Sequence, residues 1–203
     1  MHSTLKVVEM MKDIWLRKET MMRRSWNYRP VVSWLLPVLV VVSVVGILEF
    51  QKSFAAPATA PQIGYRAPQF TLTDLNGKKM NLGTAVNRNR ITLVNFWATW
   101  CPPCRAEIPE LVKFYGEYKT KGVALLAVNL QESPEAVKAF AGKNGMRFPV
   151  LLDSSGKVAQ VYQVYAIPTT FILDRHGVIR DLIQGSINLA TLQTKVGKLL
   201  AEK

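Results

Sequence analysis

The chain has 203 residues, of which 49% are hydrophobic and 20% charged, so it can form a real core and is not collagen-like, low-complexity or fully disordered. Lys and Arg exceed Asp and Glu by 26 to 14, a net charge of +12, but these cations are scattered, and we expect no nucleic-acid partner. Two cysteines cannot staple a scaffold or complete a four-cysteine zinc site, and we expect neither a metal nor a cofactor.

An uncharged apolar run, VVSWLLPVLVVVSVVGIL, occupies residues 31–48. As a helix it would reach roughly 27 Å, close to the hydrocarbon thickness of a bilayer. Residues 1–30 are rich in Lys and Arg, whereas few charges follow the run. The positive-inside rule therefore predicts a cytoplasmic N-terminal tail at 1–30, a single-pass transmembrane anchor at 31–48 in the cell membrane, and an extracytoplasmic remainder.

Two features leave the N-terminal organisation open. Ala58-Thr59-Ala60 resembles a signal-peptidase site, so a cleaved signal peptide is the alternative to a retained signal-anchor. Several internal methionines could also serve as the start of translation, namely Met10, Met11, Met21 and Met22.

Residues 49–63 are rich in Ala and Pro and predict an extended, mobile tether, and residues 64–203 predict one folded domain. The expected strands are 70–73, 79–82, 91–97, 123–128, 148–152, 169–173 and 178–183. The expected helices are 101–118, 133–144, 158–164 and 188–201. Asn76-Gly77 predicts a hairpin between the first two strands. Strands that alternate with helices and end in a hairpin plus a helix predict an α/β sandwich with a mixed sheet.

The motif Trp100-Cys101-Pro102-Pro103-Cys104 lies where a buried strand gives way to a helix. A helix N-terminus carries partial positive charge and free N–H groups, which stabilise a thiolate. We therefore expect Cys101, the first and more exposed cysteine, to be the nucleophile. Cys104, one turn later, is placed to resolve a mixed disulfide. The two prolines stiffen the loop between the cysteines.

The segment FWATWCPPC, with Ile167-Pro168-Thr169 downstream, resembles the thioredoxin family. The stretch from Gly64 to Lys203 is similar to its membrane-tethered TlpA/ResA branch, with Ala67-Pro68-Gln69-Phe70 at its start and FPVLLD at 148–153. The resemblance implies a thioredoxin-like three-layer sandwich with a mixed central sheet, an N-terminal hairpin and a central inserted helix and strand.

The same resemblance implies roles for individual residues. Pro168 matches a cis-proline that faces the CxxC motif and aligns substrate, and Ile167 would offer its backbone to that substrate. Trp100, Pro102 and Pro103 would flank the substrate beside the nucleophile. Where thioredoxin has a buried Asp, this chain has Asn95, which cannot carry a proton.

Glu107 lies three residues after Cys104, where the TlpA/ResA branch has a functional Glu. A carboxyl in a partly apolar cleft has a raised pKa and can shuttle protons. The alternative is a solvated helix anion paired with Lys113 or Arg105.

These features predict a membrane-anchored extracytoplasmic thiol–disulfide oxidoreductase that acts on protein disulfides. In the family that this chain resembles, a His between the cysteines favours strong oxidants; the loop here lacks one, so the resemblance implies a reductase. The resemblance implies recharging by a membrane thiol-transfer protein of the CcdA/DsbD type. It also implies apocytochrome c, with its CxxCH cysteines, as a client in cytochrome c maturation.

Three alternatives remain. The first is a general disulfide reductase with another client. The second is a Sco-like copper-binding module, although Sco proteins use CxxxC and only His176 could be a third ligand here. The third is a peroxiredoxin-type peroxidase, which would need Thr three residues before its reactive Cys, where this chain has Ala98.

Overall fold

The computed structural model describes residues 58–202, so the predicted tail and anchor lie outside the described residues. Its strands are β1 (Thr71–Asp74), β2 (Lys79–Asn81), β3 (Ile91–Trp97), β4 (Val123–Leu130), β5 (Val150–Asp153), β6 (Thr169–Asp174) and β7 (Ile179–Gln184). Its helices are α3 (Leu82–Arg88), α4 (Pro102–Tyr118), the 3₁₀ turn η1 (Lys119–Lys121), α5 (Pro134–Lys143), α6 (Lys157–Val161) and α7 (Leu189–Ala201).

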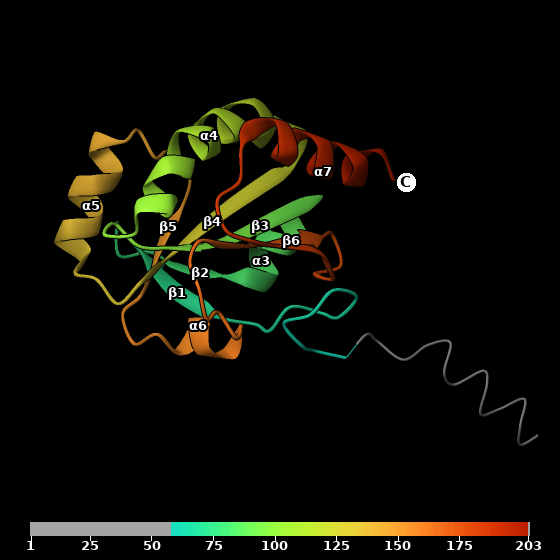
Figure 1. The fold of residues 1–203 in the computed structure, drawn as a ribbon. Helices are drawn as coiled ribbons and strands as arrows, with labels where there is room; N and C mark the ends of the chain where they lie inside the picture. Colours follow the sequence, from blue (N-terminus) through green and yellow to red (C-terminus); the bar gives the residue numbers. More distant parts are fainter. Residues whose placement is uncertain (1–57, 203) are drawn as a thin grey trace, which may run out of the picture. The chain divides into compact units, whose positions relative to one another are not determined.

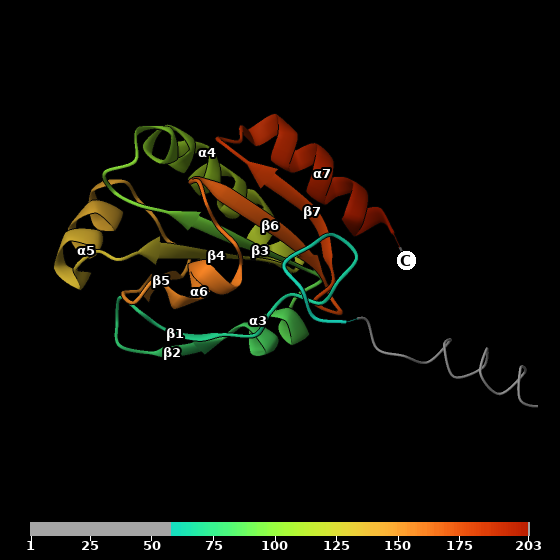
Figure 2. The same cartoon turned by 60° about the horizontal axis from the view of Figure 1, so that its bottom comes forward.

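The strands form one mixed sheet in the order β2-β1-β5-β4-β3-β6-β7. β3, β4 and β5 are parallel, and the outer strands join them antiparallel. The N-terminal hairpin β1–β2 lies at one edge and β7 at the other (Figure 2). The predicted insertion is present as α5 and β5, between β4 and β6.

Helices cover both faces of this sheet, which gives the predicted three-layer sandwich. Figure 1 shows α4 and α7 on one side and α3 and α6 on the other. Alternate residues of β3 supply the two cores because successive side chains of a strand point to opposite faces. Leu93 and Trp97 pack in the core under α4, whereas Val94 and Phe96 pack in the core with α6.

β3 is the centre of the molecule. All seven of its residues are buried, as expected of a parallel strand covered on both faces. Ile91 pairs with Val123 of β4 and with Asp174 of β6. The register places the C-terminal end of β3, and the motif that follows it, beside Thr169 at the start of β6.

Helix α3 was missing from the sequence prediction. Asn81, expected as strand, ends β2 and caps this helix by accepting a hydrogen bond from the Thr84 N–H. The helix is seven residues long and buries only Leu82 and Val86. Two apolar positions are too few to produce a recognisable helical period in a sequence.

Residues 58–63 end the segment predicted as a tether, and here they hydrogen-bond to their neighbours. The Arg66 N–H donates to the Ala58 carbonyl at 3.0 Å, the Ala60 N–H donates to the Arg66 carbonyl at 3.1 Å, and Arg66 pairs in turn with Val178, just before β7. The described part of that segment is therefore attached to the β7 side of the domain. No helix within residues 58–202 is both long and apolar enough to cross a bilayer.

Candidate active site

The two cysteines lie at the start of α4 and are joined by a disulfide. Cys101 is the N-cap residue, and Pro102 and Pro103 fill the first two helical positions. Because prolines carry no N–H, the first amide that the helix can offer is that of Cys104. This N–H points at the Cys101 sulfur at 3.3 Å, so the helix start stabilises negative charge on that sulfur.

Cys101 is slightly more exposed than Cys104, as the sequence predicts. Cys101 is 3% exposed and Cys104 is fully buried. A thiol that attacks this disulfide would therefore reach Cys101 first. Cys104 would be reached only through its neighbour, which suits a resolving cysteine.

The loop before β6 faces Cys101 from the opposite side. The Ile167–Pro168 peptide bond is cis, as the resemblance implies. The Cys101 sulfur lies 3.7 Å from the Ile167 carbonyl oxygen. Pro168 is buried, and its carbonyl accepts a hydrogen bond from the Gly185 N–H at 2.8 Å. The structure thus brings together the predicted nucleophile, Ile167 and Pro168, although they are far apart in sequence.

Glu107 is buried on α4 and is 2% exposed, so the alternative of a solvated helix anion is wrong. Lys113 pairs instead with Glu110 at 3.6 Å. One Glu107 oxygen accepts from the Asn95 side-chain amide at 2.8 Å, and the other accepts from the Ile187 N–H at 3.1 Å.

Burial raises the pKa of Glu107 to about 7, although the hydrogen bonds from Asn95 and Ile187 act to lower it. A carboxyl with this pKa can hold and release a proton near neutral pH. It lies one helical turn after Cys104, on the buried side of α4. The site therefore has a titratable group close to the resolving cysteine.

The remaining predicted residues form the rim of the site. Trp100 is 66% exposed, and Pro102 and Pro103 are also exposed. Tyr165, two residues before Ile167, is 89% exposed and was not singled out from the sequence. Two exposed aromatic rings thus lie close in sequence to Cys101 and to the cis peptide bond, where a protein substrate would make contact.

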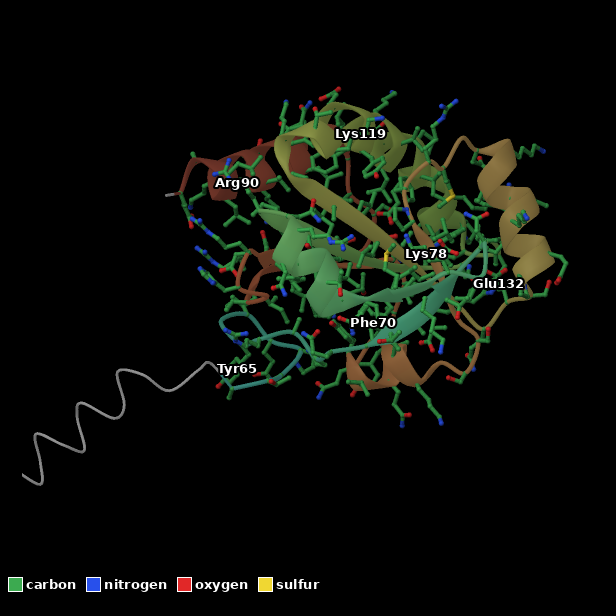
Figure 3. The ribbon with its side chains drawn as sticks, turned by 180° about the vertical axis from the view of Figure 1, so that it is seen from behind. Tyr65, Phe70, Lys78, Arg90, Lys119 and Glu132 are labelled. Atoms are coloured by element: carbon green, nitrogen blue, oxygen red, sulfur yellow. A yellow bond between two sulfur atoms is a disulfide. The ribbon has the colours of Figure 1, made fainter. Side chains whose placement is uncertain are left out.

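Sequence reasoning also missed Glu132, which follows β4 and is labelled in Figure 3. Its carboxylate accepts hydrogen bonds from the Thr99 N–H at 2.7 Å and from the Thr99 hydroxyl. It also accepts one from the Asn129 side-chain amide at 2.6 Å. Glu132 therefore fixes the loop that leads into the cysteine motif. Only its place after a β-strand could have drawn attention to it in the sequence.

His176 lies in the turn between β6 and β7 and is exposed. This turn follows Asp174, which pairs with Ile91 at the far end of β3 from the cysteines. No group of three or more His, Cys, Asp or Glu within residues 58–202 could hold a metal ion. The geometry gives no support to a copper site built from the cysteines and His176.

Comparison with known proteins agrees with this geometry. The AhpC/TSA family profile matches residues 63–182. The chain is 37% identical over 150 residues to the thiol-disulfide oxidoreductase ResA of Geobacillus kaustophilus, a match that covers 74% of this chain and 84% of that protein. It is 36% identical over 162 residues to ResA of Bacillus thuringiensis (strain Al Hakam), covering 80% and 92%.

Solved structures show the same likeness. The crystal structure of StoA from Bacillus subtilis matches with a TM-score of 0.56 and 30% identity, over 64% of this chain and 96% of that one. A putative thiol:disulfide interchange protein DsbE from Chlorobium tepidum matches with a TM-score of 0.64 and 28% identity, over 69% and 99%.

Proposed function

Because this chain belongs to the thioredoxin-like AhpC/TSA family and is a thiol–disulfide oxidoreductase similar to ResA, we propose that it reduces protein disulfides outside the cytoplasm while anchored in the membrane by residues 31–48. The proposal depends most on one juxtaposition, the Cys101 sulfur 3.7 Å from the Ile167 carbonyl. A substrate strand held along Ile167 would present its disulfide to that sulfur.

The reaction begins with the reduced enzyme. The Cys101 thiolate attacks one sulfur of the substrate disulfide, the substrate S–S bond breaks, and a mixed disulfide forms while the leaving thiolate takes a proton. Cys104 then loses its proton to Glu107 and attacks the Cys101 sulfur. The second substrate thiolate leaves and takes a proton from the solvent, and Glu107 releases the proton it received from Cys104 to the solvent. Two electrons have passed to the substrate, and the enzyme holds the Cys101–Cys104 disulfide.

A second dithiol must return these two electrons. We propose that a membrane thiol-transfer protein of the CcdA/DsbD type supplies them, because a soluble cytoplasmic donor could not reach a domain on the other side of the bilayer. The absence of a His between the cysteines supports the reducing direction. For the client we propose apocytochrome c, whose CxxCH cysteines must be reduced before haem attachment.

The test of the catalytic order is a trapping experiment in cells. Cys104→Ser removes the resolving thiol, so we expect mixed disulfides between Cys101 and client proteins to accumulate. Their masses would identify the clients. Cys101→Ser is the matched control, since it keeps one buried cysteine and should trap nothing. Equal trapping by both variants, or trapping by Cys101→Ser alone, would contradict the proposed order.

The direction is tested by the redox state of the wild-type chain in cells. A reductase should be found mainly with both thiols free, and it should become oxidised when the membrane thiol-transfer protein is deleted. Alkylation with a mass-tagged maleimide separates the two forms. A chain that stays in the disulfide form in normal cells would instead be an oxidant, and the reductase proposal would fail.

A further inference from the structure

A cavity lies away from the cysteines, beside the first half of β4. Its volume is about 350 Å³. It is bordered by β2, α3, the end of α4, η1 and β4, and two of its lining residues, Lys78 and Lys119, are labelled in Figure 3. We call it the β4 hollow and define it by its lining residues: Lys78, Lys79, Met80, Asn81, Thr84, Ala85, Arg88, Asn89, Tyr115, Lys119, Val123–Leu126 and Pro149.

The hollow exists because the hydrogen-bonded ladder between β4 and β5 ends at Pro149. β5 pairs with β4 only from Ala127 onward, where the Ala127 N–H donates to the Pro149 carbonyl at 2.9 Å. Continuing this parallel ladder by one step would require the Leu125 carbonyl to accept from the N–H of residue 149. Proline has no N–H, so the ladder stops and space remains beside the strand.

The charge around the hollow has one sign. Four of the lining residues are cations, Lys78, Lys79, Arg88 and Lys119, and all four are exposed. Within the described part of the chain, no Asp or Glu lines the hollow. The rim would therefore attract an anionic partner and repel a second copy of this basic chain.

The inner wall is different from the rim. Met80, Ala85 and Tyr115 are half-buried there, and Val123 and Leu125 are buried. The described lining includes no buried charged side chain that could hold a small anion inside the cavity. An apolar interior with a cationic rim fits an apolar side chain flanked by carboxylates, which is the chemistry of an acidic peptide segment.

The hollow is also remote from the redox site. Its β4 residues pair with residues 91–94 of β3, whereas the cysteines follow the other end of that strand. Residues 91 to 97 of an extended strand span roughly 20 Å. A partner bound in the hollow would thus leave Cys101, Ile167 and Trp100 free to contact a disulfide.

We propose that the β4 hollow binds an acidic segment of a partner protein. An apolar side chain of that segment enters the hollow, and the carboxylates on either side of it contact the cationic rim. Disulfide exchange meanwhile proceeds at the opposite end of the sheet. This docking site is independent of the identity of the redox client. The same cations have a competing explanation, which is that positive charges beside a strand edge prevent unwanted pairing with other chains.

The test measures binding of a fluorescein-labelled peptide, Glu-Asp-Phe-Asp-Glu, to the full chain in neutral detergent micelles by fluorescence anisotropy. The triple variant Lys78→Gln, Lys79→Gln and Lys119→Gln, which we call the cleft variant, removes three of the four cations that line the β4 hollow. Its matched control removes three exposed cations that do not line the hollow: Lys138, Lys143 and Lys157, each changed to Gln. A second variant, Ala85→Leu, places a larger side chain in the hollow and leaves every charge in place.

We expect the cleft variant and Ala85→Leu each to weaken binding at least tenfold and the control to weaken it less than threefold. A peptide with Gly in place of Phe should also bind at least tenfold more weakly. Disulfide reduction and the thermal unfolding midpoint should stay unchanged in the cleft variant. These results together would support a docking site that is separate from the redox site.

Three results would overturn the proposal. Equal losses in the cleft variant and its matched control would mean that the peptide responds only to net charge. Equal binding of the Phe and Gly peptides would mean that the apolar interior is not used. Self-association of the cleft variant in light scattering, with no peptide binding to the wild type, would show that the cations protect the strand edge.

Discussion

Substituting Glu107 by Gln should change how the stability of the protein depends on pH. The carboxyl is 2% exposed, and burial raises its pKa from 4.5 to about 7. Below pH 4.5 both the folded and the unfolded chain hold this proton. Between pH 4.5 and 7 only the folded chain still holds it, so the free energy of unfolding falls as the pH rises through that window.

The magnitude follows from the size of the shift. A rise of the pKa from 4.5 to about 7 corresponds to about 3 kcal/mol between the protonated and ionised forms. Wild-type protein should therefore lose about 3 kcal/mol of stability between pH 4.5 and pH 8 through this one residue. An amide cannot ionise, so Glu107→Gln should lack this loss.

The glutamine side chain can keep the local hydrogen bonds. Its oxygen can accept from the Ile187 N–H, as a Glu107 oxygen does now at 3.1 Å. Its NH₂ group would meet the NH₂ of Asn95, which now donates to Glu107 and to the Thr170 hydroxyl oxygen. Reversing the Asn95 amide presents its oxygen to both groups and restores the bonds.

The assay is urea unfolding of the disulfide form in detergent micelles at pH 4.5 to 8, with Glu117→Gln as control. Glu117 is exposed on the same helix and accepts from Gln193 at 2.8 Å, so this control should follow the wild type. The difference in stability between Glu107→Gln and wild type should grow by about 3 kcal/mol across the range. Parallel curves for the two proteins would refute a buried, proton-holding Glu107.

Three further predictions concern Glu132, Trp100 and His176. Glu132→Ala removes the acceptor of the Thr99 N–H and should lower stability by about 1–3 kcal/mol in urea unfolding, with partial recovery in Glu132→Gln; an unchanged midpoint would contradict its anchoring role. Trp100→Ala should leave the melting temperature unchanged because the ring is 66% exposed, yet it should lower kcat/KM for a protein disulfide and not for a small aromatic disulfide; equal losses for both substrates would argue against a contact with protein substrates. His176→Ala should alter neither disulfide turnover nor copper binding by the reduced chain, and a loss of bound copper in titration calorimetry would revive the metal-carrier alternative.

Much of the fold could be predicted because its central elements have strong local signals. The uninterrupted apolar run of 91–97 has the signature of a strand buried on both faces, and the structure confirms β3 at those residues. Ser133 before Pro134 predicts a helix start, and the Ser133 hydroxyl does accept from the Ala136 N–H at 3.2 Å. Such signals depend on neighbouring residues only, so a sequence displays them directly.

The parts that escaped prediction depend on contacts between distant residues. Glu132 acts on Thr99, 33 positions earlier, and its place after a β-strand, its one local signal, says nothing about this partner. The β4 hollow depends on Pro149, which has no N–H, lying at the position where the next hydrogen bond of the parallel β4–β5 ladder would form. The β1–β5 pairing likewise joins Thr73 to Leu152. Sequence patterns could predict the helices and strands but not these contacts between distant residues.

The proton site shows why a resemblance was needed in addition to the sequence pattern. The helical period around Glu107 is compatible with either a solvated or a buried carboxyl. A solvated carboxyl paired with a cation would have a lowered pKa, whereas a buried carboxyl has a raised pKa. The Glu107 carboxyl on α4 is buried where three parts of the fold come together. Asn95 on β3 and Ile187 before α7 both donate hydrogen bonds to it. Because Asn95 cannot ionise, the buried cluster has one titratable carboxyl and avoids the repulsion between two adjacent carboxylates. A single proton position beside Cys104 is therefore a property of the assembled sheet and helices, which no single segment of the chain determines.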